Sequence, residues 1–172
     1  MAYKLLVIQG GGVFGYIPAR FIGHYNHTKP LTESVDFFSG TSVGGILSIM
    51  YAQGQHPAIV LLKFNNLAET AFPGSWFGNL FGPKHSDKNL NKILKESITG
   101  EFGDIRPRLI IPAIDFIREQ PKIFDNIIPD DDLKWPAWEV ARATAAAPTY
   151  FPPWRGMIDG GLISNLPIIE AA

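Results

Sequence analysis

Residues 35–45 read VDFFSGTSVGG, and this stretch decides the fold. An apolar strand candidate at residues 35–39 runs into a turn of the form G-x-S-x-G, and an apolar helical pattern follows it. Gly40 and Gly44 let the backbone bend sharply and approach its neighbours without a Cβ clash. A serine between such a strand and such a helix projects from the turn, beside the positive end of the helix dipole. Ser42 is therefore the candidate nucleophile of an enzyme.

Strand and helix patterns alternate along the rest of the chain. Strands are predicted at residues 5–8, 35–39, 108–116, 122–124 and 157–159, and helices at residues 16–27, 43–53, 57–69, 87–99 and 135–147. Pro112 lies inside one predicted strand, which indicates an edge strand or a strand with a bulge. The alternation predicts an α/β fold with a mainly parallel central sheet flanked by helices, in one domain that spans residues 1–172.

The composition limits the classes of function. The 172 residues are 46% hydrophobic and 18% charged, as in a globular chain, and the net charge of -1 argues against nucleic-acid binding. The absence of cysteine excludes disulfides, a thiolate nucleophile and a cysteine zinc site. The sequence shows neither a signal peptide nor a run of roughly 20 apolar residues. We therefore expect a cytoplasmic protein, which leaves open docking onto a membrane from outside.

The nucleophile needs a base, and histidine is not the candidate. A Ser-Asp-His order would need a histidine late in the chain. All four histidines lie in the first half: His24, His27, His56 and His85. Asp159 ends the last predicted strand and precedes two glycines that allow close approach. Burial would raise its pKa from about 3.9 towards useful basicity, although the same tripeptide is also typical of a plain turn.

The glycine-rich stretch after the first strand has two interpretations. Residues 10–15 read GGGVFG, which contains the dinucleotide-binding pattern G-x-G-x-x-G. That interpretation requires an acidic residue at the end of the second strand, about 20 residues on. Asp36 starts its strand instead, which disfavours nucleotide binding. The alternative is an oxyanion hole, formed by backbone N–H groups of Gly10, Gly11 and Gly12.

In their order, these motifs resemble the patatin-like phospholipase family. The family pattern is a glycine-rich loop, a G-x-S-x-G turn and a late Asp-Gly-Gly. Residues 143–148 and 150–153 are similar to the family's approach to the aspartate, and residues 165–167 are similar to its usual sequel. The resemblance implies a three-layer α/β architecture and spans nearly the whole chain.

The resemblance also implies an activity. Ser42 would attack the acyl carbonyl of a phospholipid or related lipid ester, and Asp159 would take its proton directly. An acyl-enzyme would form, and water would release the fatty acid. The resemblance implies no metal, calcium included, and no cofactor.

Two departures from the family pattern keep other outcomes open. Phe14 stands where the family loop usually carries Arg or Lys, just before the last glycine. The chain ends at Ala172, 13 residues after Asp159, so it is expected to be either a fragment or a compact variant. The alternatives are a catalytically weak or inactive binding module with this fold and a soluble-ester hydrolase with the same dyad.

An aromatic segment is the candidate for contact with a membrane. Residues 72–86 combine glycine and proline with four large aromatic side chains: Phe72, Trp76, Phe77 and Phe81. Aromatic rings interspersed with glycine can insert at the depth of lipid headgroups. The alternative is that these rings cover the domain's own core. The sequence leaves the oligomeric state open.

Overall fold

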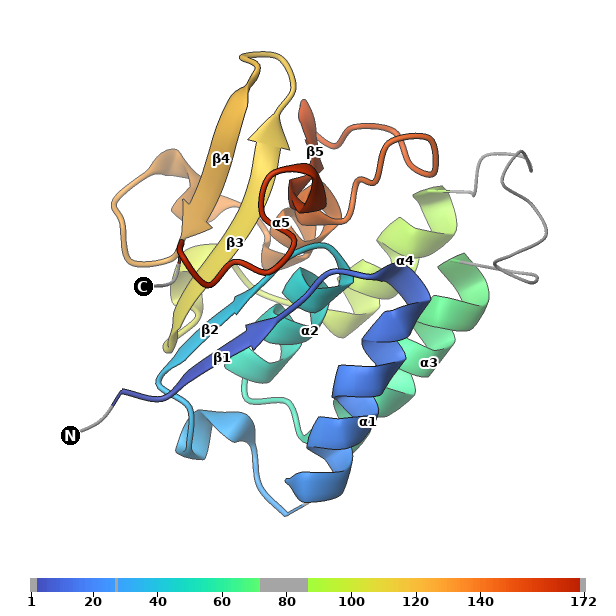
Figure 1. Cartoon of the computed structure of the whole chain (residues 1–172), viewed down its shortest axis with the longest axis vertical. Helices are drawn as coiled ribbons and strands as arrows, with labels where there is room; N and C mark the ends of the chain where they lie inside the picture. Colours follow the sequence, from blue (N-terminus) through green and yellow to red (C-terminus); the bar gives the residue numbers. More distant parts are fainter. Residues whose placement is uncertain (1–2, 27, 72–86, 171–172) are drawn as a thin grey trace.

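The computed structural model describes residues 3–26, 28–71 and 87–170 (Figure 1), and five strands form one sheet. The strands are β1 (Leu5–Ile8), β2 (Phe37–Gly40), β3 (Arg108–Asp115), β4 (Gln120–Asp125) and β5 (Met157–Asp159). Their order is β1-β2-β3-β4, and β5 also pairs with β3. β1, β2 and β3 are parallel, whereas β4 and β5 are antiparallel to β3. The expected sheet of mostly parallel strands is confirmed.

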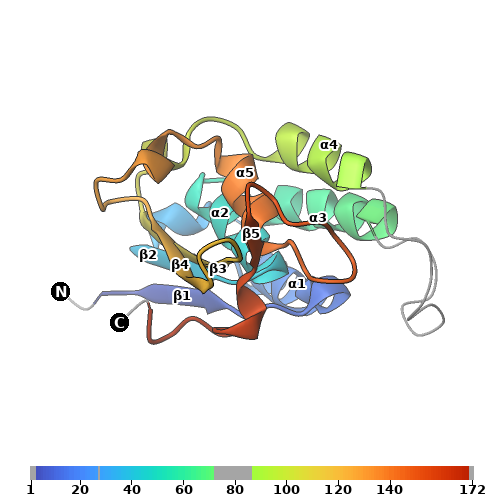
Figure 2. The same ribbon diagram turned by 90° about the horizontal axis from the view of Figure 1, so that it is seen from above.

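The described helices gather around one face of the sheet. They are α1 (Tyr16–Tyr25), α2 (Val43–Ala52), α3 (Pro57–Ala71), α4 (Asp87–Ser97) and α5 (Ala137–Thr144). All ten residues of α2 are buried, because α2 lies between the sheet and the helices α3 and α5 (Figure 2). This arrangement confirms the α/β class. Residues 160–170 cross the opposite face, where the only described helix is the short 3-10 turn Gly160–Leu162.

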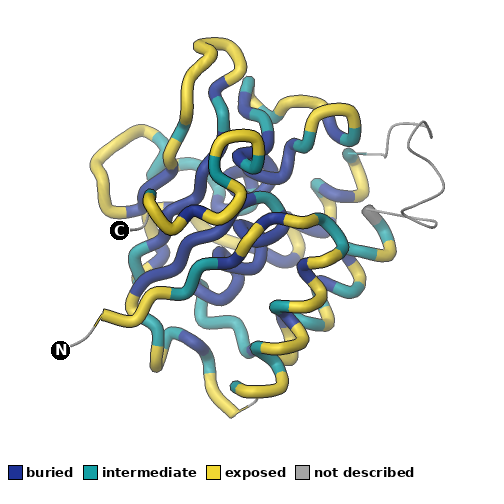
Figure 3. The backbone as a smooth tube through the Cα atoms, in the orientation of Figure 1, coloured by how far each residue is buried: buried dark blue, intermediate teal, exposed yellow. Residues whose placement is uncertain are grey.

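The two faces of β2 explain why its sequence is apolar throughout. Successive side chains of a strand point to opposite faces. Phe38 belongs to the main core beneath α2, whereas Phe37 packs with Ile110 in a separate small cluster. On that second face, the hydroxyl of Ser39 donates to the carbonyl oxygen of Ile110 at 2.9 Å. Both faces of β2 are therefore buried (Figure 3), as expected for a strand inside a parallel sheet.

The prediction that Pro112 marks an edge strand is wrong. β3 pairs with β4 on one side, and on the other side β2 pairs up to Ile110 and β5 pairs from Ala113. Pro112 therefore falls at the junction between β2 and β5. A residue's N–H and C=O point to the same side of a strand, and the Pro112 carbonyl oxygen accepts a bond from the hydroxyl of Thr144 at 2.6 Å. An N–H at this position would point to the junction between β2 and β5. The lack of an N–H in proline therefore costs the sheet no hydrogen bond.

The start of α2 touches the carboxyl end of β1. A Cβ atom on Gly44 would lie less than 3.0 Å from the carbonyl oxygen of Ile8, which belongs to the backbone and cannot swing away. A helix can begin this close to a strand only with glycine at that position. Gly44 therefore sets how closely the serine turn approaches the glycine-rich loop.

We predict that Gly44→Ala lowers the free energy of unfolding by about 1–3 kcal/mol through overpacking. Gly23→Ala, in α1, is the matched control, because its Cβ would meet nothing closer than Leu61 Cδ2 at 3.9 Å. That change is expected to raise the free energy of unfolding by about 0.5–1 kcal/mol. Urea denaturation followed by circular dichroism measures both values. Equal stability of the Gly44→Ala protein and the wild type would contradict the close approach.

Candidate active site

The serine turn holds a strained backbone. Ser42 has φ 55° and ψ -126°, a positive-φ conformation that costs a non-glycine residue about 1–3 kcal/mol. The hydrogen bonds on either side of the turn stabilise it. The Ser42 carbonyl oxygen accepts the N–H of Ile46 at 3.1 Å, and the Thr41 hydroxyl donates to the carbonyl oxygen of Ser164 at 2.6 Å. The turn therefore presents the Ser42 side chain at the N-terminus of α2.

Ser42 and Asp159 lie in hydrogen-bond contact, although 117 residues separate them in the chain. The Ser42 Oγ donates to Asp159 Oδ2 at 2.6 Å. Asp159 reaches this position because β5 pairs with β3, where it lies opposite Ala113. Its other carboxylate oxygen, Oδ1, accepts the N–H of Gly161 at 2.7 Å. Both oxygens are thus oriented, and one of them faces the serine hydroxyl.

Burial changes the acid–base properties of Asp159. The residue is only 6% exposed. Burial raises the pKa of its carboxyl above the ordinary value of 3.8, and the hydrogen bonds from Ser42 and Gly161 lower it by less. A raised pKa makes the carboxylate a stronger base. The group can therefore accept a proton from the serine hydroxyl more readily than an exposed aspartate could.

Thr144, the last residue of α5, fixes the serine turn to the sheet. Its fully buried Oγ1 accepts the N–H of Ser42 at 3.0 Å and donates to the Pro112 carbonyl oxygen at 2.6 Å. Sequence reasoning noted this threonine only as part of a stretch similar to the family. No local signal identifies the role, because the contact exists only once α5 packs against β3.

The glycine-rich loop lies beside the serine turn. A Cβ atom on Gly10 would come within 3.2 Å of the Ser42 Cβ. The N–H of Gly10 donates to the Asn165 carbonyl oxygen at 3.0 Å, so this group is already used. The N–H groups of Gly11 and Gly12 stand at the start of a 3-10 helix, where they have no acceptor within the helix. These two groups are therefore suited to hold an oxyanion near Ser42.

The geometry of the loop gives no support to dinucleotide binding. Asp36 precedes β2, and its Oδ2 accepts the backbone N–H of Lys4 at 2.9 Å. The parallel register aligns Ile8 with Gly40. The acidic residue therefore lies at the opposite end of β2 from the glycine-rich loop, where it cannot reach a nucleotide bound there.

A small apolar cavity of about 100 Å³ lies next to the serine turn. It is lined by residues of the glycine-rich loop, α2, α3, α4 and the segment after α5: Gly12, Val43, Ile46, Leu67, Leu90, Ala145, Ala147, Tyr150 and Phe151. Val43 directly follows Ser42, and Gly12 lies in the glycine-rich loop. An apolar space in this position can accommodate carbon chains but offers little to a charged ligand.

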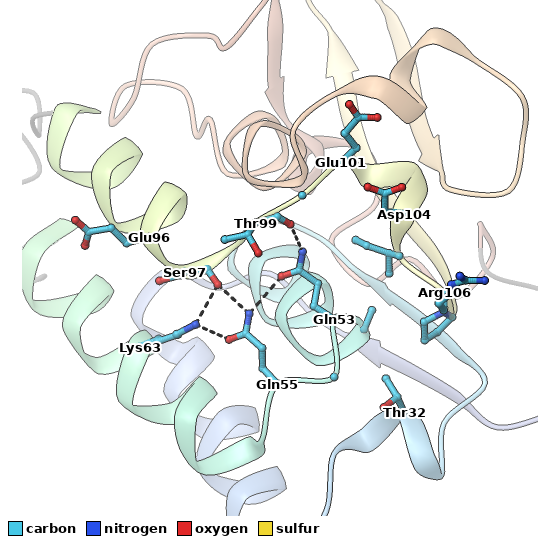
Figure 4. Close-up of a pocket in the computed structure, with 15 residues that line it drawn as sticks. Thr32, Gln53, Gln55, Lys63, Glu96, Ser97, Thr99, Glu101, Asp104 and Arg106 are labelled. Carbon is cyan, nitrogen blue, oxygen red and sulfur yellow. Dashed lines mark hydrogen bonds between the residues drawn. The ribbon is translucent and has the colours of Figure 1, made fainter.

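A second, polar pocket of about 680 Å³ lies at the other end of α2 (Figure 4). Its polar groups bond to one another: Lys63 Nζ donates to Gln55 Oε1 at 2.8 Å and to the Ser97 carbonyl oxygen at 3.1 Å. None of the predicted site residues line it. Ten helical residues span about 15 Å, so this pocket is remote from Ser42.

The described histidines, which the sequence disfavoured as the base, lie on other elements. His24 is on α1, and the Nδ1 of His56 accepts the N–H of Ala58 at the start of α3. Within the described ranges, no three His, Asp or Glu side chains gather where a metal ion could bind. In the same ranges, no helix is long and apolar enough to cross a membrane. The four aromatic residues predicted for membrane contact lie outside the described residues: Phe72, Trp76, Phe77 and Phe81.

Comparison with known proteins identifies similar sequences. The sequence model of a family described as "Patatin-like phospholipase" matches residues 6–172. A cGAMP-activated phospholipase of Pseudomonas aeruginosa is 30% identical, over 96% of this chain and 54% of that protein. Patatin-17 of Solanum cardiophyllum is also 30% identical, over 87% of this chain and 43% of that protein. The chain thus spans about half the length of the curated relatives that it matches.

We predict that Asp159→Asn raises the free energy of unfolding at neutral pH. Because the pKa of Asp159 is higher in the folded than in the unfolded chain, the folded state binds more protons between these two values. Wild-type stability therefore falls as the pH rises through that window. Asparagine carries no charge at any pH. The gain in stability over the wild type should therefore vanish at a pH below the folded and unfolded pKa of Asp159. Urea unfolding at neutral and acid pH measures it.

Asp115→Asn is the matched control, and its expected change in stability has the opposite sign. Hydrogen bonds from the Arg118 backbone and guanidinium lower the pKa of the Asp115 carboxyl. Its charge therefore stabilises the fold at neutral pH, and this change should reduce stability there. If both variants lose stability at neutral pH, burial of the Asp159 charge is not the dominant effect.

Proposed function

Since the chain belongs to the patatin-like phospholipase family, we propose that it is a lipid acyl hydrolase with Ser42 as nucleophile and Asp159 as general base. The observation that carries the proposal is the hydrogen bond of 2.6 Å from Ser42 Oγ to Asp159 Oδ2. A base within this distance of a serine hydroxyl meets the geometric requirement for proton transfer. The two residues come from separate motifs, so their contact is not a consequence of proximity in sequence.

The proposed reaction proceeds through an acyl-enzyme. Ser42 Oγ attacks the carbonyl carbon of the ester while Asp159 takes its proton. The oxygen of the tetrahedral intermediate accepts the N–H groups of Gly11 and Gly12, and the N-terminus of α2 adds positive partial charge beside it. Asp159 then protonates the departing alcohol oxygen. Water, deprotonated by the same carboxylate, releases the fatty acid and restores the serine.

The proposed substrates are fatty-acyl esters of phospholipids or related lipids. The apolar cavity beside Ser42 supports this class, because its lining suits part of an acyl chain. The relatives named phospholipases support it as well. Lipids of this kind reside in membranes, so the proposal includes contact with a membrane surface. The rival hydrolase with the same dyad would instead prefer monomeric esters over micellar ones.

We predict that a fluorophosphonate probe labels Ser42, because an activated serine attacks phosphorus as it attacks an ester. Ser42→Ala should remove the label, and Asp159→Asn should slow labelling by about 10²–10⁴-fold, the usual contribution of a general base. Mass spectrometry of the digested protein locates the adduct. Ser164→Ala is the matched control and should label like the wild type. A folded wild-type protein that takes no label would favour the inactive binding module.

We also predict the pH dependence of hydrolysis. The base must be ionised to accept a proton, so kcat/KM should fall as the pH drops through the pKa of Asp159. Because burial raises that pKa, the acid limb should lie at a higher pH than the titration of an ordinary aspartate. Initial rates on a soluble ester across acid pH give the profile. An acid limb at the ordinary aspartate value would argue against Asp159 as the base.

A further inference from the structure

A row of large apolar side chains faces solvent along α1 and the short helical turn that precedes it. Phe14, Ile17, Phe21 and Tyr25 are 54%, 64%, 61% and 71% exposed. Their spacing of three and four residues puts them on one helical face. Exposed stretches recur along this helix (Figure 3). We call these four residues the α1 stripe. Single exposed apolar residues are common, but an ordered row indicates a binding surface.

The segment that carries the stripe has charges of one sign along its own sequence. Arg20 lies between Ile17 and Phe21 and is exposed. No acidic residue occurs before Glu33, so all 16 acidic residues of the chain follow this segment. An amphipathic helix with aromatic residues on one face and a cation beside them can bind a surface of anionic lipid.

An apolar groove extends from the stripe to the glycine-rich loop. The groove has a volume of about 800 Å³ and lies between α1 and β1. Three stripe residues line it together with Gly10, Gly11 and Leu166. Gly10 is also the residue that lies against Ser42. Lipid that meets the stripe would therefore lie beside the loop that borders the serine turn.

We propose that the α1 stripe docks this protein on a bilayer that contains anionic phospholipid. This proposal rests on the proposed function for the direction of substrate transfer, whereas the binding itself does not require catalysis. Phe14 adds an aromatic ring at the end of the stripe nearest the glycine-rich loop. Aromatic side chains insert at headgroup depth, and Arg20 lies beside lipid phosphates.

A second copy of the chain fits the stripe less well. A two-fold symmetric interface contacts the same surface on both partners. Two stripes in contact would bring two Arg20 side chains together, with no acidic residue of either segment to neutralise them. Like charges across an interface oppose association. An anionic bilayer supplies the missing opposite charge.

The test is vesicle flotation of the full chain that carries Ser42→Ala as the parent. This change removes the proposed nucleophile, so that binding is measured without hydrolysis of the lipid. Vesicles contain phosphatidylcholine alone or a mixture with phosphatidylglycerol. The Ile17→Ser, Phe21→Ser variant should reduce binding to the mixed vesicles by at least about tenfold, because two exposed apolar anchors are lost. The Ile59→Ser, Leu62→Ser variant on α3 is the matched control, with side chains 45% and 64% exposed. It should bind like its parent.

Charge is tested separately from apolar contact. Arg20→Glu should weaken binding to the mixed vesicles, with little change for phosphatidylcholine alone, and added salt should reduce this difference. Equal binding by the stripe variant and the α3 control, or no binding by the parent, would overturn the proposal. The proposal would also be overturned if sedimentation showed that the parent is a dimer and that the only effect of the stripe variant is to make it a monomer. Probe labelling of Ser42 in the unmutated chain reports separately on the proposed hydrolase.

Discussion

The backbone of Ser42 is the constraint on which the rest of the structure depends. A serine at φ 55° is strained, and its neighbours must hold it there. Gly44 lets α2 begin against the carbonyl oxygen of Ile8, and Thr144 binds the Ser42 N–H. Without either support, the backbone of Ser42 could relax to an unstrained conformation. The burial of α2 along its whole length keeps the turn, the sheet and the helix in one rigid unit.

β3 brings the distant parts of the site together. Its first half pairs with β2, which leads into Ser42, and its second half pairs with β5, which ends at Asp159. Pro112 lies at the change of partner, and its carbonyl oxygen anchors Thr144. One strand thus positions the serine, the carboxylate and the residue that braces the turn. Its proline is compatible with this role because the junction needs no N–H donor.

The site combines a few polar groups with apolar surroundings. Burial makes Asp159 more basic but also makes its charge costly to the fold. Such a cost is expected where a carboxylate must act as a base. Under the two proposals, the apolar cavity would take part of an acyl chain and the α1 stripe would meet the bilayer.

The amino-acid sequence by itself determined most of the elements and the two candidate catalytic residues. Apolar runs and glycine-flanked turns are local, so β1, β2, α2 and the candidate Ser42 could be predicted from short stretches. Asp-Gly-Gly is also typical of a plain turn, so the candidate Asp159 depended on the order of the motifs along the chain. Tertiary structure alone decided that Pro112 falls at the junction between β2 and β5, that Thr144 meets Ser42, and that Asn165 occupies the N–H of Gly10. It also decided that one face of α1 stays exposed. These contacts join residues far apart in the chain, and periodicity shows that a face is apolar but not which surface covers it.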